Sequence, residues 1–401
     1  MSSLNPLSRA LAALLFFSCA CGPPPRPGPF YSAPRAEGSP GELVRSEPFP
    51  GSPPGSSAWK ILYVSTGLDG RPTEVSGVVI APDLPPPDGG RPIVAWAHPT
   101  TGVDDRCAPS NWPEFFETIP HLTALVALDY VVVATDYAGL GTPGPHPYLV
   151  GESEGRAVLD SVRAARAVEK GHAGRRFAVW GHSQGGHAAL FAGQLAARYA
   201  PELELAGIAA IAPATDLEKL LRDDLSERAG RVIAAYSLWS WSRIYSASLL
   251  EIVSSQEISM IDRVARDCVE SDGEVYRVGW DSRELRASLL EQSAYSVQPW
   301  ARLMSQNRPG GARAGAPLYV AQGTADTIVR PSVTSDFVRG LCGHGEIVQF
   351  DELPGVSHVR AGRASATAAI QWIRDRFDGK PPPNSCDALQ RWREEAARPV
   401  N

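Results

Sequence analysis

The chain has 401 residues, of which 43% are hydrophobic and 20% are charged, and its formal net charge is −6 at pH 7. This composition is ordinary for globular proteins and excludes a wholly disordered chain, a collagen and a polytopic membrane protein. The net negative charge provides no global basic field of the kind that nucleic-acid binding needs, so we expect no nucleic-acid partner.

The first residues predict an export signal. Arg9 precedes an apolar run at 10–17, which ends at small residues and is too short to span a bilayer. A cysteine after such a run resembles a bacterial lipoprotein signal, in which that cysteine is lipidated, and Cys19 or Cys21 would take this position. We therefore assign 1–21 to a signal and expect an exported bacterial protein, either anchored in the cell envelope or secreted. Cleavage without lipidation and an N-terminal core helix are the alternatives.

A segment at 22–58 follows, rich in proline, glycine, serine and arginine without any period. Such a segment buries too little apolar surface to offset the entropy that is lost on ordering. We expect a disordered tether between the signal and the folded part of the chain.

The next part predicts strands that alternate with helices. Two strands at 59–65 and 73–82 are separated by a turn cluster and predict a hairpin. Further strands are predicted from short apolar runs at 92–97, 130–135, 176–180, 206–213, 317–322 and 346–351. Helical patterns occur around 112–127, 153–169, 186–199, 331–341 and 362–378. The alternation predicts an α/β fold with a mostly parallel sheet of about eight strands and helices on both faces.

Residues 215–304 lack strand runs and predict a helical cap inserted into the core, which would then consist of 59–214 and 305–401. A transmembrane segment here is a weak alternative, because charges and serines interrupt the apolar pattern. Several aromatic residues of this cap either line an apolar substrate pocket or pack the cap's own core. They are Tyr236, Trp239, Trp241 and Tyr245.

Four cysteines follow the signal, and none is paired at a metal-ligand spacing such as C-x-x-C. In an exported chain, an even number of scattered cysteines favours disulfides, and four cysteines allow three connectivities. We favour Cys107–Cys268 and Cys342–Cys386, because the second bond would tie the end of a late helix to the C-terminal tail. Free buried thiols are the alternative.

Residues 181–185 read Gly-His-Ser-Gln-Gly, which is the pattern G-x-S-x-G between a predicted strand and a predicted helix. In this context the pattern favours a sharp turn that lifts the Ser183 hydroxyl above the sheet as a nucleophile. A Cβ atom at Gly181 or Gly185 would collide with neighbouring backbone. A plain glycine–serine turn is the alternative.

Serine is a weak nucleophile and needs a base. In hydrolases of this kind the order along the chain is the serine, then an aspartate or glutamate, then the histidine that acts as base. Asp326 and His358 lie in loops after predicted strands, at the sheet edge where Ser183 also lies. His344 lies at the opposite edge. We therefore predict Ser183 as nucleophile, His358 as base and Asp326 as the residue that orients the base. Less suitable acids, inside or at the ends of predicted elements, are Asp336, Asp351 and Glu352.

A tetrahedral intermediate at Ser183 would need preorganised N–H donors. The backbone of Gln184 directly follows the nucleophile and would supply one of them. The second is expected from the loop after 92–97, at Thr100 or, as an alternative, at Thr101, because Pro99 has no N–H. This mechanism requires no metal and no organic cofactor.

These motifs resemble those of the secretory lipase family, which are α/β-hydrolases that include fungal lipase A and bacterial exported homologues. The similar segments are AWAHPTTGVDDRCAPS, DYAGLGTPGPHPYLVGESEGRAVLDSVRAAR, GHSQGGHAAL, QGTADTIVRP and LPGVSHV, which begin at 95, 136, 181, 322 and 353. The resemblance implies hydrolysis of small-molecule or lipid esters by Ser183, Asp326 and His358, with a helical cap inserted before the aspartate. Pro99 departs from the glycine that is frequent there in bacterial members.

The same triad would also serve acyl transfer to an alcohol or peptide hydrolysis, and the sequence does not separate these reactions from ester hydrolysis. A catalytically inactive surface protein that binds through its cap is a hypothesis of another class. Because inactive relatives usually lose a member of the triad, and all three are present here, the sequence favours an enzyme.

Overall fold

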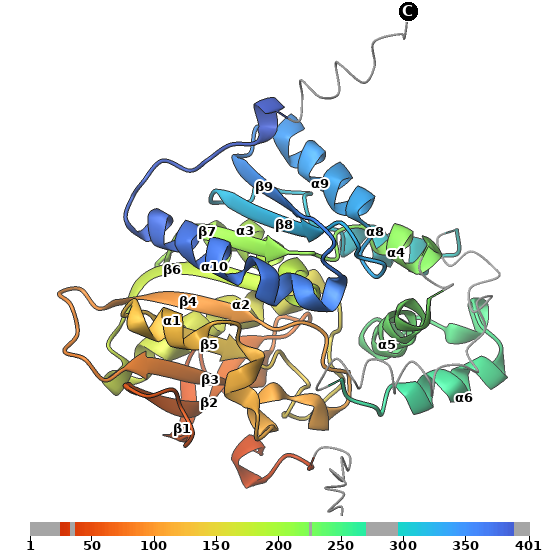
Figure 1. The fold of residues 1–401 in the computed structure, drawn as a ribbon. Coiled ribbons are helices and arrows are strands. Elements are labelled where there is room, and N and C mark those ends of the chain that lie inside the picture. Colours follow the sequence, from red (N-terminus) through yellow and green to blue (C-terminus); the bar gives the residue numbers. More distant parts are fainter. Residues whose placement is uncertain (1–24, 33–36, 224–226, 270–295, 389–401) are drawn as a thin grey trace, which may run out of the picture.

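The computed structural model describes residues 25–32, 37–223, 227–269 and 296–388 (Figure 1). Within them, nine strands form one sheet in the order β1-β2-β3-β5-β4-β6-β7-β8-β9. The strands are β1 Leu43–Pro48, β2 Ser56–Thr66, β3 Pro72–Pro82, β4 Arg91–Ala97, β5 Val131–Thr135, β6 Ala173–His182, β7 Glu204–Ile211, β8 Leu318–Gly323 and β9 Val348–Leu353. Strands β4 to β9 pair with one another in parallel, whereas the pairs β1–β2, β2–β3 and β3–β5 are antiparallel. The predicted α/β class with a mostly parallel sheet is confirmed.

Helices cover both faces of the sheet. The helices are α1 Leu122–Ala127, α2 Gly151–Ala167, α3 Gln184–Tyr199, α9 Pro331–Gly343 and α10 His358–Phe377. Helices α2, α3 and α9 share one apolar cluster with the sheet, and α1 and α10 share another. Because β4 and β5 are buried on both sides, their sequences read as continuous apolar runs.

The helix expected over 112–127 is only partly formed. The structure has the 3-10 turns η3 Pro109–Asn111 and η4 Phe115–Thr118, and a regular helix only in α1. Pro113 and Pro120 interrupt the segment, because proline lacks the N–H that a helix interior requires.

The expectation of a disordered tether over 22–58 is wrong for the second half of that segment. Strand β1 pairs with β2 and adds the ninth strand. Further upstream, the ring of Tyr31 is buried, and its hydroxyl is 2.9 Å from Ser110 Oγ. The apolar pattern does not reveal β1, because most of its side chains are exposed and its pairing uses backbone groups that every residue carries. The predicted signal at 1–21, with Cys19 or Cys21 as a lipidation site, lies outside the described residues.

Between β7 and β8 the described residues contain helices and no strand. The helices are α4 Leu217–Asp223, α5 Arg228–Ile244, α6 Ser255–Val264 and α8 Trp300–Gln306. They share an apolar cluster with residues outside the insertion, among them Tyr148, Leu149 and Val150 before α2, and α5 and α6 lie to one side of the sheet (Figure 1). None of the described helices is both long and apolar enough to cross a membrane.

Two disulfides tie distant parts of the chain together. They join Cys107 to Cys268 and Cys342 to Cys386, the pairing that we favoured from the sequence. The first bond connects the segment after β4 to the end of the α6 region. The second connects α9 to the residues after α10.

Candidate active site

Ser183 lies at the sharp turn between β6 and α3. Its φ angle is 58°, a left-handed conformation that is rare for residues with a side chain. The backbone N–H of Ser183 donates to the carbonyl of Ile211, and its carbonyl accepts from the N–H of His187. Such a strained turn persists only where surrounding contacts hold it, and it is typical of functional sites.

Close backbone packing explains the glycines on both sides of Ser183. A Cβ atom at Gly181 would lie 2.0 Å from the carbonyl oxygen of Gly185, and one at Gly185 would lie 1.9 Å from the carbonyl oxygen of Ala97. The same Cβ at Gly185 would lie 2.8 Å from the carbonyl oxygen of His98. The end of β4 therefore rests against the first turn of α3.

Gly185→Ala is expected to lower the free energy of unfolding by about 3 kcal/mol or more, because a new methyl group would overlap backbone that has no room to move. Gly340→Ala is the matched control, since a Cβ there meets nothing within 4 Å and the residue lies in α9. That control is expected to be neutral or to stabilise by up to about 1 kcal/mol. Thermal unfolding of both variants checks this, and a wild-type melting temperature for Gly185→Ala would contradict it.

Ser183, His358 and Asp326 form one line of hydrogen bonds. The hydroxyl of Ser183 is 2.8 Å from His358 Nε2, and His358 Nδ1 is 2.7 Å from Asp326 Oδ2. All three residues are less than 9% exposed. Since the carboxylate of Asp326 only accepts, His358 carries its proton on Nδ1, and Nε2 is free to accept from the serine.

Backbone and side-chain donors fix the carboxylate of Asp326. Its Oδ1 accepts from the N–H groups of Ile328 and Val329, at 2.9 and 2.8 Å, and its Oδ2 accepts from Gln322 Nε2 at 2.9 Å. Burial alone raises the pKa of Asp326, but the charge and hydrogen bond of His358 and the two N–H groups outweigh it, so the pKa lies below its usual range. The group is therefore an ionised acceptor that holds His358 in one orientation. The sequence did not single out Gln322.

The residues predicted to donate to an oxyanion lie at the start of α3 and in the loop after β4. Gln184 is the first residue of α3, so its N–H has no partner within the helix. Thr100 is half-buried in the loop after β4, and its hydroxyl is 2.7 Å from the hydroxyl of Tyr148. The carbonyl of the neighbouring Thr101 accepts a hydrogen bond from the N–H of Val269, which directly follows Cys268 of the first disulfide.

His182, inside the G-x-S-x-G motif, supports the backbone of His358. Its Nε2 donates to the carbonyl of His358 at 3.0 Å, and the two rings lie 5.0 Å apart. Burial and the charge of His358 lower the pKa of His182 to about 3. His182 is therefore neutral at pH 7, so it adds no positive charge next to His358. Sequence reasoning gave His182 no role.

The pKa of His182 makes the stability depend on pH. A histidine whose pKa is lower in the folded protein binds fewer protons when folded than when unfolded, so stability falls as pH drops below about 6.5. Between pH 7 and pH 5, wild type is expected to lose about 2 kcal/mol more unfolding free energy than His182→Gln, whose amide still donates to the His358 carbonyl. Urea denaturation at both pH values measures this. The exposed His344, changed to Gln, is expected to follow wild type, and equal pH dependence in all three proteins would contradict the prediction.

A narrow cavity lies beside Ser183, with room for about one water molecule at about 10 Å³. Most of its walls are apolar. They are formed by Tyr148, Leu149, Ser183, Gln184, Ala214, Leu220, Gly230, Ile233, Ile328 and Val329. Helices α4 and α5 supply Leu220, Gly230 and Ile233, so the helical insertion closes the cavity from one side.

None of the four cap aromatics proposed as pocket residues lines this cavity. Tyr236 and Trp241 are wholly buried in the apolar cluster of the insertion, and Trp241 Nε1 donates to the carbonyl of Tyr148. The hydroxyl of Tyr245 pairs with the side chain of Asn307. Tyr148 and Asn307 lie outside 215–304, so these aromatics also pack the insertion against the rest of the chain, and their role as pocket residues stays a prediction.

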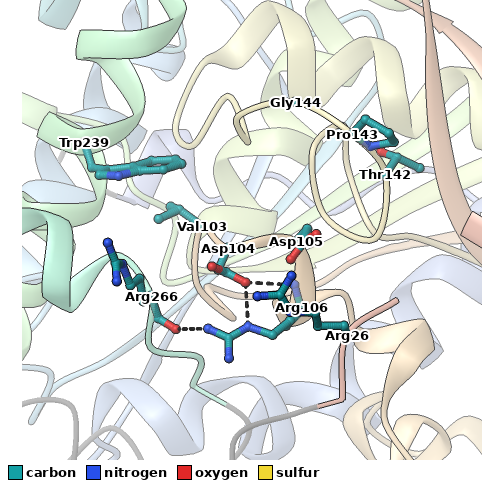
Figure 2. A pocket seen from close by; sticks show the side chains of 10 residues that line it. All are labelled: Arg26, Val103, Asp104, Asp105, Arg106, Thr142, Pro143, Gly144, Trp239 and Arg266. Atoms are coloured by element: carbon teal, nitrogen blue, oxygen red, sulfur yellow. Dashed lines mark hydrogen bonds and ion pairs between the residues drawn. The ribbon is translucent and has the colours of Figure 1, made fainter. Parts of the chain in front are cut away.

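Trp239 lies instead on a second, larger cavity of about 550 Å³ (Figure 2). Figure 2 shows Trp239 above an ion pair between Arg106 and Asp104, and Arg106 also donates to the carbonyl of Arg266. Ser183, Asp326 and His358 are not among the residues that line this cavity. Among the described residues, no group of three or more histidine, cysteine, aspartate or glutamate side chains is arranged to hold a metal ion.

Comparison with known proteins shows the family of this chain. A family model described as secretory lipase matches residues 117–385, which is more than half of the chain. The chain belongs to the secretory lipase family. The resemblance seen in the sequence is thereby confirmed, and the protein is a carboxylic ester hydrolase. Family membership and the two disulfides indicate that it is exported.

Individual members of the family are distant in sequence. Lipase 5 of Candida albicans is 24% identical over 92% of this chain and 84% of its own length. A probable inactive lipase of Mycobacterium tuberculosis is also 24% identical, over 89% of this chain and 83% of its own. The structure of lipase A of Candida antarctica superposes with a TM-score of 0.74 at 18% identity, covering 90% of this chain and 88% of that one. The structural likeness supports the α/β-hydrolase fold.

Proposed function

We propose that this secretory lipase hydrolyses carboxylic esters through an acyl-enzyme formed on Ser183. The line of hydrogen bonds from Ser183 through His358 to Asp326 is the observation that carries this proposal. It supplies a nucleophile, a base within reach of the hydroxyl proton, and a carboxylate that holds the base in the required tautomer.

The reaction runs in two halves. Ser183 Oγ attacks the ester carbonyl while His358 Nε2 takes the hydroxyl proton, and the N–H groups of Gln184 and Thr100 stabilise the oxyanion. The imidazolium of His358, stabilised by Asp326, then gives the proton to the leaving alcohol, and the acyl group stays on Ser183. In the second half His358 activates a water, which releases the acid and restores the serine.

The cavity beside Ser183 would receive the acyl part of the substrate. Its walls suit a hydrocarbon chain, but its volume of about 10 Å³ does not accommodate one. Substrate entry therefore requires Leu220 of α4 and Ile233 of α5 to move. In this proposal the insertion at 215–304 is a cap over a core formed by 59–214 and 305–401, and the substrate is a lipid ester. Hydrogen exchange in α4 and α5 is expected to change when an alkyl phosphonate occupies Ser183.

A serine-directed phosphonate tests the mechanism. The wild-type protein is expected to cleave a short-chain chromogenic ester and to carry one phosphonyl group on Ser183 after inactivation, as identified by mass spectrometry of peptides. A folded protein with neither turnover nor labelling would contradict the proposal and would favour the alternative of an inactive binding protein, to which one relative's name points.

Acyl transfer and peptide hydrolysis are separated from ester hydrolysis by competition. With an ester as acyl donor, we expect the free acid as the main product even when an alcohol is added, and we expect slow turnover of the matching amide. An ester product that dominates in dilute alcohol would assign the enzyme to acyl transfer.

The N-terminal segment completes the proposal. Either Cys19 or Cys21 would become the lipidated first residue of a bacterial envelope protein, and cleavage without lipidation is the alternative. The intact mass of the mature protein decides between them, because a lipidated protein is heavier than its polypeptide and partitions into detergent.

A further inference from the structure

A buried polar network lies behind the proposed oxyanion hole. It contains the side chains of Gln184, Glu154 and His187, each at most 1% exposed. Glu154 comes from the first turn of α2, and the other two residues come from the first turn of α3. Most buried polar groups in proteins are hydrogen-bonded, and here Gln184 is held through its side-chain nitrogen, whereas its side-chain oxygen has no partner among the described residues.

Glu154 anchors the side chain of Gln184. Gln184 Nε2 donates to Glu154 Oε1 at 2.8 Å, and Oε1 also accepts from the N–H of Leu149 at 2.9 Å. The second hydrogen of Gln184 Nε2 goes to His146 Nε2 at 3.0 Å. Burial lowers the pKa of His146 to about 4, so its ring is neutral, and because its Nδ1 donates to the carbonyl of Ala138 at 2.8 Å, Nε2 accepts.

His187 completes the surroundings of Glu154. His187 Nδ1 is 2.7 Å from Glu154 Oε2, and His187 Nε2 donates to the carbonyl of Asn307 at 2.8 Å. One proton lies between Nδ1 and Oε2, so the pair as a whole carries no net charge. A neutral, fully bonded pair avoids the large penalty of an isolated charge in the interior.

The network also contacts the cap at two points. Asn307 follows α8, and its side-chain nitrogen donates to Tyr245 Oη at the end of α5, at 3.0 Å. The carbonyl of His146 accepts from Ser240 Oγ of α5 at 2.6 Å. The groups that hold Gln184 are thus themselves held by the cap.

We propose that Glu154 is a positioning residue for the oxyanion hole. The inference rests on the proposed function, in which the backbone N–H of Gln184 stabilises the oxyanion. That N–H follows the left-handed turn at Ser183, and its direction depends on how the peptide between Ser183 and Gln184 is rotated. The N–H groups of His187 and Ala214 hold the carbonyl of this peptide, and Glu154 holds the side chain of Gln184, so that the N–H is fixed from both sides. Glu154 does not contact the substrate.

Glu154→Ala tests the inference by removing the anchor. We expect kcat for a short-chain ester to fall by about 10-fold to 100-fold with KM nearly unchanged, because the donor is misaligned for the transition state and the apolar cavity is intact. Glu154→Gln is the conservative variant. Its oxygen can accept from Leu149 and Gln184 while its amide donates to a neutral His187, so we expect it to retain most of kcat.

Asp160→Asn is the matched control. Asp160 is a buried carboxylate on the same helix, held by Ser65, Tyr199 and Arg163, and it has no hydrogen bond to Gln184. This variant is expected to lower stability while kcat stays within about twofold of wild type. Gln184→Ala removes the side chain that Glu154 holds and keeps the backbone N–H. It is expected to lower kcat as much as Glu154→Ala does. If Glu154→Ala does not fold, Gln184→Ala is the variant that tests the inference.

Three results would overturn the inference while wild type remains active. They are full kcat in folded Glu154→Ala or Gln184→Ala, an equal loss of kcat in Asp160→Asn, and a Glu154→Gln variant as slow as Glu154→Ala. A folded wild type that neither hydrolyses esters nor reacts with the phosphonate would overturn the proposed function and this inference together, so the two failures are distinguishable.

Discussion

Ser183→Ala is expected to lower kcat for ester hydrolysis by about 10⁴-fold to 10⁶-fold, with little change in KM. The hydroxyl of Ser183 is the only group at this turn that faces His358 Nε2, and an alanine leaves no atom to form the acyl-enzyme. His358→Ala is expected to have a similar effect, because these residues act as one unit and their losses do not add. Initial rates with a chromogenic ester measure both.

Two variants control for general damage. His344→Ala removes an exposed histidine after α9, which the sequence predicts to lie at the sheet edge opposite Ser183. This variant is expected to leave kcat unchanged. Ser183→Ala is expected to melt close to the wild-type temperature, because alanine is subject to the same backbone restriction at this φ angle as serine and removes only one hydroxyl group. Ser183→Ala turnover within tenfold of wild type would show that another residue is the nucleophile.

Loss of the Cys107–Cys268 disulfide is expected to have the second largest effect. The double variant Cys107→Ala/Cys268→Ala should lower the free energy of unfolding by about 2–5 kcal/mol, since the bond closes a long loop. It should also lower kcat by about tenfold or more. The N–H of Val269, next to the bond, donates to the carbonyl of Thr101, which adjoins the proposed oxyanion donor Thr100.

The second disulfide provides the comparison. Cys342–Cys386 joins α9 to the residues after α10. Its double alanine variant is expected to lose a similar free energy of unfolding with kcat unchanged. Denaturation midpoints and initial rates, measured below the melting temperature of every variant, separate the two effects. Equal kcat in both double variants would show that the first bond only stabilises the fold.

Local patterns were sufficient for much of the fold. The central parallel strands β4 and β5 are buried on both faces, so they appear as apolar runs, and the sharp turn at Ser183 requires glycines on both sides. The order serine, aspartate, histidine at the carboxyl ends of strands predicted that Ser183, Asp326 and His358 would meet. In the structure they lie within hydrogen-bond distance.

Other features depend on contacts between segments that are far apart in the chain. The strand β1 has no apolar period, because it forms by backbone pairing along an edge. The sequence of the cap aromatics looks the same whether their rings line a pocket or pack in an apolar core. Only the three-dimensional packing shows that Tyr236 and Trp241 are buried in an apolar cluster.

The sequence by itself predicted the fold class and selected Ser183, Asp326 and His358 as candidate site residues, because periodicity and chain order express them locally. Only the tertiary structure decided what surrounds them. Glu154 and His187 stand 33 residues apart, and nothing in their spacing shows that one proton lies between them. Three-dimensional packing turns these two side chains into a support for Gln184, since a hydrogen bond depends on distance and direction in space and leaves no period in the chain.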